Sequence, residues 1–163
     1  MGVRNLGELG PNLQKIIKRL LANKDLVKLL YYTDKDPFNN PELTEEEIRE
    51  KVYEKLIKIV PRVGPKETAN SIIAMSIRKG TQNEKNGEFK NIKIAFEVFT
   101  PLTQWIIKDE NLRPFAIMGQ IQESLNGKTV NGLGKIRGGD FELNFLTEEI
   151  SCYLQEFSIT TYE

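Results

Sequence analysis

The chain has 163 residues, of which 39% are hydrophobic and 28% charged, a composition typical of a folded domain rather than a disordered one. Its 23 Lys and Arg equal its 23 Asp and Glu, which argues against a broad basic surface for nucleic-acid phosphates. One cysteine, Cys152, and no histidine exclude an intrachain disulfide, the usual zinc sites and histidine-based nucleophilic catalysis. We therefore expect one domain over residues 1–163, without cofactor, metal or membrane span.

The first part of the domain, residues 11–60, is predicted to be helical. Pro11 suits the first position of a helix, and apolar residues recur after it at intervals of three and four up to Leu21. Asn23 can cap a second short helix, which is either separate from the first or continuous with it through a kink.

A capping box predicts where the next helix begins. Thr44 is followed three residues later by Glu47, so the hydroxyl and the carboxylate can each bind the other residue's backbone N–H. The apolar positions of this helix continue to Ile59, and the PRVGP segment over residues 61–65 then breaks it.

The second part, residues 70–163, is predicted to form a sheet and one further helix. The clearest strand signal is Asn91 to Thr100, in which large apolar residues alternate with mostly polar ones. Helices should cover one face of this sheet and water the other. A strand over residues 70–79 precedes it and predicts an antiparallel hairpin.

The segment between these two strands is long and polar. It comprises Lys79, Gly80, Thr81, Gln82, Asn83, Glu84, Lys85, Asn86, Gly87 and Glu88. A long loop without a core of its own is more often functional or disordered than structural. We therefore predict that it is a docking loop.

Two large side chains near the third helix are candidates for subunit contacts. Trp105 is expected in the core, with an interface role as the second interpretation because large aromatic residues anchor subunit contacts. Arg113 directly precedes Pro114, which opens a helix, and a cation is unfavourable there. Arg113 is therefore expected to pair with Asp109 or Glu110.

The last third of the chain adds strands. Residues 138–140, Gly-Gly-Asp, predict a tight turn between two strands, and a final strand is predicted over residues 151–162. The whole order predicts an α+β fold: an antiparallel or mixed sheet of about four or five strands, with two or three helices packed on one face.

This pattern resembles the small neck and tail-completion proteins of tailed bacteriophages, which include tail terminators and head–tail joining proteins. The resemblance is carried by IIKRLLANKDLVKLLYYTDKDP (Ile16 to Pro37), IKIAFEVFTP (Ile92 to Pro101), Trp105 and LRPFAIMGQIQESLNG (Leu112 to Gly127), followed by GLGKI and a strand pair. It covers most of the chain as a pattern rather than as a sharp motif.

The resemblance implies a structural protein of the virion, assembled in the host cytoplasm, and not an enzyme. Such proteins form rings, commonly hexamers, that complete or terminate the tail tube and join it to the head connector. It further implies that the sheet is extended across subunits or tiled edge to edge. The loop over residues 80–88 would then reach a neighbouring ring of tail-tube or connector protein, and DNA would pass through the lumen without specific binding. A head-closure or adaptor ring of the same neck is the alternative.

A second interpretation from another class is a small nucleic-acid-binding module. The basic residues that would make a modest patch are Lys90, Lys93, Lys135 and Arg137. Against this interpretation, the strands lack the interleaved aromatic and basic residues that bind single strands.

A third interpretation is an enzyme that works through carboxylates. Glu97 with Asp140 or Glu142 would supply the pair of acids. General acid–base chemistry needs two such groups in one cleft with separated pKa values, and nothing in the sequence places them so.

Overall fold

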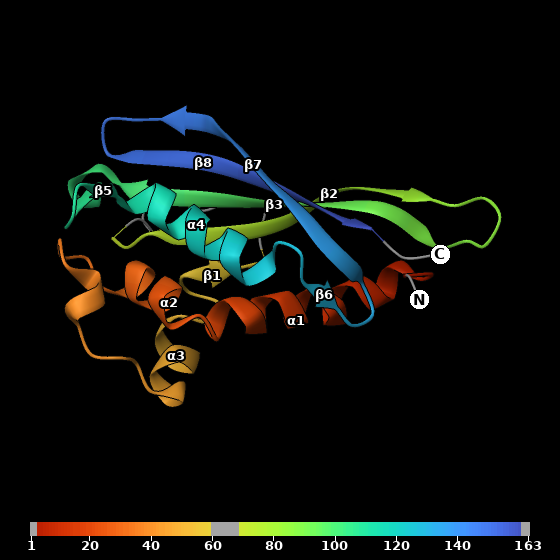
Figure 1. Ribbon diagram of the computed structural model, residues 1–163, viewed down its shortest axis with the longest axis horizontal. Helices are drawn as coiled ribbons and strands as arrows, with labels where there is room; N and C mark the ends of the chain where they lie inside the picture. The colour runs from red at the N-terminus through yellow and green to blue at the C-terminus, as the bar shows by residue number, and fades with distance from the viewer. Residues whose placement is uncertain (1–2, 60–68, 161–163) are drawn as a thin grey trace.

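The computed structural model describes residues 3–59 and 69–160. The α-helices in these ranges are α1 (Leu9–Leu21), α2 (Lys24–Tyr31), α3 (Glu45–Lys51) and α4 (Arg113–Leu125). The strands are β1 (Ile57–Lys58), β2 (Ile72–Gln82), β3 (Phe89–Pro101), β4 (Ile106–Ile107), β5 (Asn111–Leu112), β6 (Thr129–Val130), β7 (Gly134–Leu146) and β8 (Ile150–Thr160). Figure 1 shows α1, α2 and α4 along one side of a strongly curled sheet, with α3 farther from it.

The sheet is mixed, and its strand order is β1-β2-β3-β8-β7-β6. Only the β1–β2 pair is parallel, and β4 and β5 form a separate antiparallel pair. The expected sheet of four or five strands with two or three helices is therefore wrong: the described residues form a six-stranded curled sheet and four α-helices. The sequence signal missed β1 and β6 because two residues are too few to show a period.

The capping predictions for the N-terminal helices are confirmed. Asn23 Oδ1 accepts the backbone N–H of Leu26 at 3.0 Å, which starts α2 as a helix separate from α1. Thr44 and Glu47 make both hydrogen bonds of the capping box at the start of α3. These short polar side chains satisfy N–H groups that the first turn leaves without a partner.

Two predicted helix boundaries are wrong. α1 begins at Leu9, so Pro11 occupies its third position rather than its first. α3 ends at Lys51, and the apolar residues beyond it enter a turn and then β1. β1 pairs with β2 through Ile57 opposite Ile73, so the end of the predicted helical stripe is buried as a strand instead. The predicted PRVGP break lies outside the described residues.

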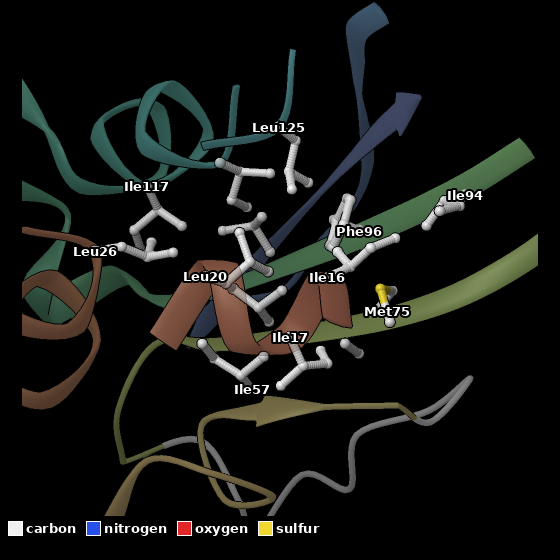
Figure 2. Packing of buried hydrophobic residues seen from close by; sticks show 14 of the residues in the cluster. Ile16, Ile17, Leu20, Leu26, Ile57, Met75, Ile94, Phe96, Ile117 and Leu125 are labelled. Carbon is white, nitrogen blue, oxygen red and sulfur yellow. The ribbon is translucent and has the colours of Figure 1, made fainter. Parts of the chain in front are cut away.

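The predicted apolar face of β3 forms the centre of the hydrophobic core. Ile92, Ile94, Phe96 and Val98 are all buried, and the ring of Phe96 meets that of Phe157 edge to face at 5.7 Å between centroids. Figure 2 shows this face meeting side chains from the helices. Those labelled there are Ile16, Ile17, Leu20, Leu26, Ile117 and Leu125, with Ile57 and Met75 from the neighbouring strands.

The opposite face of the sheet is not wholly in water, contrary to the expectation. Phe99 and Cys152 are register partners on this face, and both are buried. The ring of Phe145, from β7, lies 5.9 Å from the ring of Phe99. Part of this face is therefore covered by side chains of the sheet itself.

β2 and β3 form the predicted antiparallel hairpin, but its loop is shorter than expected. β2 continues to Gln82 and pairs there with Phe89, so Lys79 to Gln82 belong to a strand. Only residues 83–88 form the turn, in which Asn83 and Glu88 share a backbone hydrogen bond of 2.7 Å. Figure 1 shows the hairpin projecting from the body of the protein.

Arg113 ties the N-terminal helices to the rest of the protein. Its side chain is fully buried, and its guanidinium donates to the backbone carbonyls of Leu29 at 2.6 Å, Tyr32 at 2.8 Å and Gln104 at 2.9 Å, and also to that of Asp34. Burial lowers the pKa of Arg113, and the nearby Asp34 opposes this shift. Arginine remains charged in such a site, so each bond is charge-assisted.

We predict that Arg113→Lys destabilises the fold by about 2–4 kcal/mol, because an ammonium group cannot reach all the carbonyls that the planar guanidinium bridges. Urea unfolding followed by circular dichroism measures the loss. Arg137→Lys is the matched control: Arg137 is exposed on β7, so the change should stay within about 0.5 kcal/mol. Equal effects of the two substitutions would contradict the structural role of Arg113.

Candidate functional site: an open sheet edge with an apolar surface

The outer side of β7 is the most conspicuous open surface of the sheet. β8 pairs with β7 from Lys135 to Leu146, whereas β6 pairs with it only at Gly134 and Lys135. From residue 137 to residue 146 no described strand lies on the outer side. Figure 1 shows this part of β7 as the outermost strand of the sheet. The Gly138 N–H donates to Asn126 Oδ1, and beyond it a row of backbone N–H and C=O groups is available to another strand.

The side chains of this strand are unusually apolar for an exposed edge. Phe141 is 55% exposed, Leu143 51%, Phe145 42% and Leu146 60%. Phe141 and Leu143 lie on the helix-covered side of the sheet, because their register partners are Gln155 and Tyr153. Protein surfaces that gather large apolar side chains commonly serve as binding surfaces.

Two bulges shape the edge. The predicted turn at residues 138–140 is wrong, because Gly138, Gly139 and Asp140 lie within β7, where the register to β8 shifts. Gly138 has φ +129°, and a Cβ there would lie 3.0 Å from the carbonyl oxygen of Glu156. Only glycine fits this position, so the bend of β7 is built into the sequence.

An apolar groove adjoins this edge. It has a volume of about 610 Å³ and is lined by Lys35, Leu102, Thr103, Trp105, Ile106, Leu143, Leu146 and Tyr153. The rings of Trp105 and Tyr153 lie 6.2 Å apart, and Phe115 and Phe141 extend the aromatic cluster. The β7 edge and this groove together form the candidate interface, which we call the β7 surface.

The structure separates the two predicted subunit-contact residues. Trp105 is partly exposed and lines the groove of the β7 surface, so it is placed where a partner would meet it. Arg113 is buried, and it binds backbone carbonyls rather than the predicted Asp109 or Glu110. The expectation of a direct subunit contact by Arg113 is therefore corrected.

The three carboxylates of the enzyme interpretation share one face of the sheet but do not form a catalytic pair. Glu97 and Glu142 flank Leu154 on neighbouring strands, which separates their backbones by roughly 10 Å. Glu97 instead accepts a hydrogen bond from Cys152 and lies 3.9 Å from Arg78. Asp140 and Glu142 line a shallow hollow of about 170 Å³ together with Glu156.

The basic residues of the nucleic-acid interpretation gather near the other end of the sheet. Lys93 and Arg137 both have Ser158 as a register partner, and Lys135 is opposite Thr160. Lys90 pairs with Thr81 in the hairpin. These residues thus lie on neighbouring strands, although none of the aromatic side chains described above accompanies them on this face.

Two further properties of the described residues bear on function. No group of three or more His, Cys, Asp and Glu side chains in residues 3–59 and 69–160 is arranged to hold a metal ion. In the same ranges, every helix is too short or too polar to cross a membrane.

The sequence interpretation missed the β7 surface, although part of its signal was visible. Phe141, Leu143 and Phe145 alternate as in a half-buried strand, which predicted burial of one face. Periodicity does not reveal whether a covering element exists. The adjacent Leu146 breaks the alternation, and this was the one local indication that both sides of the strand carry apolar residues.

The architecture and the β7 surface define a class: an α+β protein whose sheet has an open, apolar edge suited to association. The family model of YomW matches residues 23–151, well over half of the chain, so the chain belongs to the YomW family. This family is phage-like and associated with prophages. Comparison with curated proteins gives no match.

Cys152 offers a test of how tightly this part of the sheet is packed. Its thiol is buried, and burial together with the nearby Glu97 raises its pKa to about 12. The unfolded thiol ionises near its usual pKa of about 8.5, so between that pH and about pH 12 the unfolded state holds fewer protons than the folded state.

We predict that Cys152 therefore lowers the stability of the protein as the pH rises above about 9, by up to about 1.4 kcal/mol per pH unit. Urea unfolding of the wild type and Cys152→Ala at several pH values isolates this effect, because alanine does not titrate. The stability difference between the two proteins should shrink as the pH rises. A difference that stays constant from pH 8 to 10.5 would contradict the burial of the thiol.

Proposed function

We propose that this chain is a structural protein of a phage or phage-derived particle. In this proposal, copies of the chain form a ring in the neck, a hexamer. The ring completes or terminates the tail tube and joins it to the head connector. The protein acts by assembly and not by catalysis. Its place of action is the virion, after assembly in the host cytoplasm.

The observation that carries this proposal is the β7 surface. An unpaired strand edge that also bears large exposed apolar side chains is an association hazard for a protein that stays alone. Natural edge strands are usually blunted or covered, whereas Phe141, Leu143 and Leu146 remain exposed here. Such a surface is understandable when another protein chain covers it in the working assembly.

Two further arguments support a phage setting. Membership of a phage-like family agrees with the resemblance to neck and tail-completion proteins. The equal numbers of acidic and basic residues suit a ring whose lumen passes DNA without holding it. A head-closure or adaptor ring of the same neck would use the same kind of surface and is the alternative position within this proposal.

The β2–β3 hairpin is the proposed contact with a neighbouring ring of tail-tube or connector protein. It projects from the body of the protein. Its turn over residues 83–88 carries acidic and basic side chains, Glu84 and Lys85 among them. The turn is held by local hydrogen bonds, including one from the Lys85 backbone N–H to Asn83 Oδ1. A projecting, locally ordered hairpin reaches beyond the subunit without the entropy cost of a loose loop.

We predict that the wild-type protein, alone or co-expressed with tail-tube protein, sediments at several times its 18.7 kDa chain mass. Leu143→Arg should reduce the assembled species strongly, because it places a charge in the β7 surface, while the circular dichroism spectrum stays unchanged. Leu6→Arg is the matched control, since Leu6 is equally large and exposed but lies in the N-terminal 3₁₀ turn.

Two results would contradict the proposed function. One is a protein that remains monomeric at every concentration and with tail-tube protein present. The other is its absence from purified particles of a phage that encodes it, measured by mass spectrometry.

A further inference from the structure

We infer that the strand that covers β7 in the assembly is β2 of a second copy of this chain, so that copies add head to tail. This inference rests on the proposed function, which states only that the β7 surface is an assembly surface. The inference adds which surface of the second copy meets the β7 surface, and which residues face each other there.

β2 provides the second open edge of the sheet. β1 covers it only at Ile73 and Ala74. From residue 76 to residue 82 no described strand lies on its outer side, and the side chains from Arg78 to Gln82 are exposed. Among residues 3–59 and 69–160, each subunit thus has two edges without a strand beside them, one at β7 and one at β2.

The strand directions of these two edges are compatible. The β2–β3, β3–β8 and β8–β7 pairs are all antiparallel, so β2 and β7 run in opposite directions within one subunit. In a head-to-tail assembly with a modest rotation per step, each copy keeps nearly the orientation of its neighbour. The β2 strand of the next copy therefore meets β7 as an antiparallel partner, and the ladder continues across the interface.

The charges of the two edges are complementary. β7 presents Asp140 and Glu142, which form no ion pair with the described residues, and β2 presents Arg78 and Lys79. Arg78 lies 3.9 Å from Glu97 in its own subunit, a long contact that leaves it able to meet a second carboxylate. Opposite charges on directly facing strand positions stabilise a pair, whereas like charges destabilise it.

One register brings one pair of opposite charges and one pair of apolar side chains face to face. If Glu142 lies opposite Arg78 of the next copy, the antiparallel count places Leu143 opposite Ile77. Leu143 is half exposed and Ile77 partly exposed, and both lie on the helix-covered side of the sheet.

Pairing of two identical edges is less favourable. Two β7 edges would bring Asp140 and Glu142 against the same carboxylates of a partner, and two β2 edges would oppose Arg78 and Lys79. Like charges directly opposite each other destabilise a strand pair. A head-to-tail contact avoids this repulsion and uses both edges of each copy, and it closes a ring when the rotation per step permits.

Charge reversal at each edge tests the inference. We expect Asp140→Lys with Glu142→Lys, and separately Arg78→Glu with Lys79→Glu, to abolish the assembled species seen by sedimentation. An equimolar mixture of the two double variants should restore it, because each reversed edge then meets a complementary edge of the other variant. Arg49→Glu with Glu50→Lys, on the exposed helix α3 away from both edges and from the hairpin, is the control with no net change of charge and should assemble as the wild type does.

Cysteine cross-linking identifies the facing strands directly. We expect Glu142→Cys and Arg78→Cys, mixed under mild oxidation, to form a disulfide-linked dimer, whereas neither variant alone does. Lys18→Cys, on the exposed side of α1, is the control that should not link. The buried native Cys152 does not compete.

Three results would overturn the inference. If Glu142→Cys links to itself, two β7 edges face each other. If both double variants still assemble, another surface joins the copies, and the proposed function stands without this interface. If neither the wild type nor any cysteine pair associates, even with tail-tube protein, both the inference and the proposed function are contradicted.

Discussion

The fold depends on burial of one apolar face of β3 and β8. Three helices are available for this: α1, α2 and α4 supply the side chains that pack on Phe96 and Phe157 and complete the core. Most of their apolar surface lies over β2, β3 and β8. On the far half of β7 the ring of Phe115 from α4 meets that of Phe141 at 5.6 Å between centroids, but Phe141 and Leu143 stay about half exposed. The exposed residues Phe141 and Leu143 continue the same face as the core residues. The open surface is thus the continuation of the core and not a separate feature.

Arg113 fixes the segment that carries Trp105, at one side of the β7 surface. Its guanidinium joins the end of α2 and the following loop to the carbonyl of Gln104, the residue next to Trp105. The backbone N–H of Arg113 also donates to the carbonyl of Trp105 at 2.7 Å. The backbone that carries the indole is therefore fixed by hydrogen bonds to two consecutive carbonyls, those of Gln104 and Trp105. Aromatic side chains that are already ordered lose less conformational entropy when a partner binds, which favours an interface at this place.

Features that arise within a few residues were predictable from the sequence. The alternation in β3, the Asn23 cap and the capping box of Thr44 each reflect short-range physics, and the structure has all three. Features set by distant parts of the chain were not predictable. β1 is a strand only because β2 lies beside it, and Arg113 found carbonyls of residues about 80 positions earlier rather than the neighbouring acids.

The β7 surface, too, was predictable where it depends on neighbouring residues and not where it depends on distant parts of the chain. The apolar alternation of Phe141, Leu143 and Phe145 was visible, and it predicted a strand correctly. Whether a helix covers that strand depends on where α4 ends and how far the sheet curls, neither of which a local pattern contains. The role of Trp105 as a subunit contact remains a prediction, and Trp105 lines the groove of the β7 surface.

The central claim is that assembly covers the open edge of β7, and residue-resolved amide hydrogen exchange tests it most directly. Backbone N–H groups of residues 140–146 that point away from β8 should exchange rapidly in the monomer, because no described group of the chain binds them, whereas the Gly138 N–H donates to Asn126 Oδ1. The account predicts that these amides become protected when the protein assembles, while those of the exposed α3 helix do not change. Assembly that leaves the outward β7 amides exchanging as fast as in the monomer would contradict it.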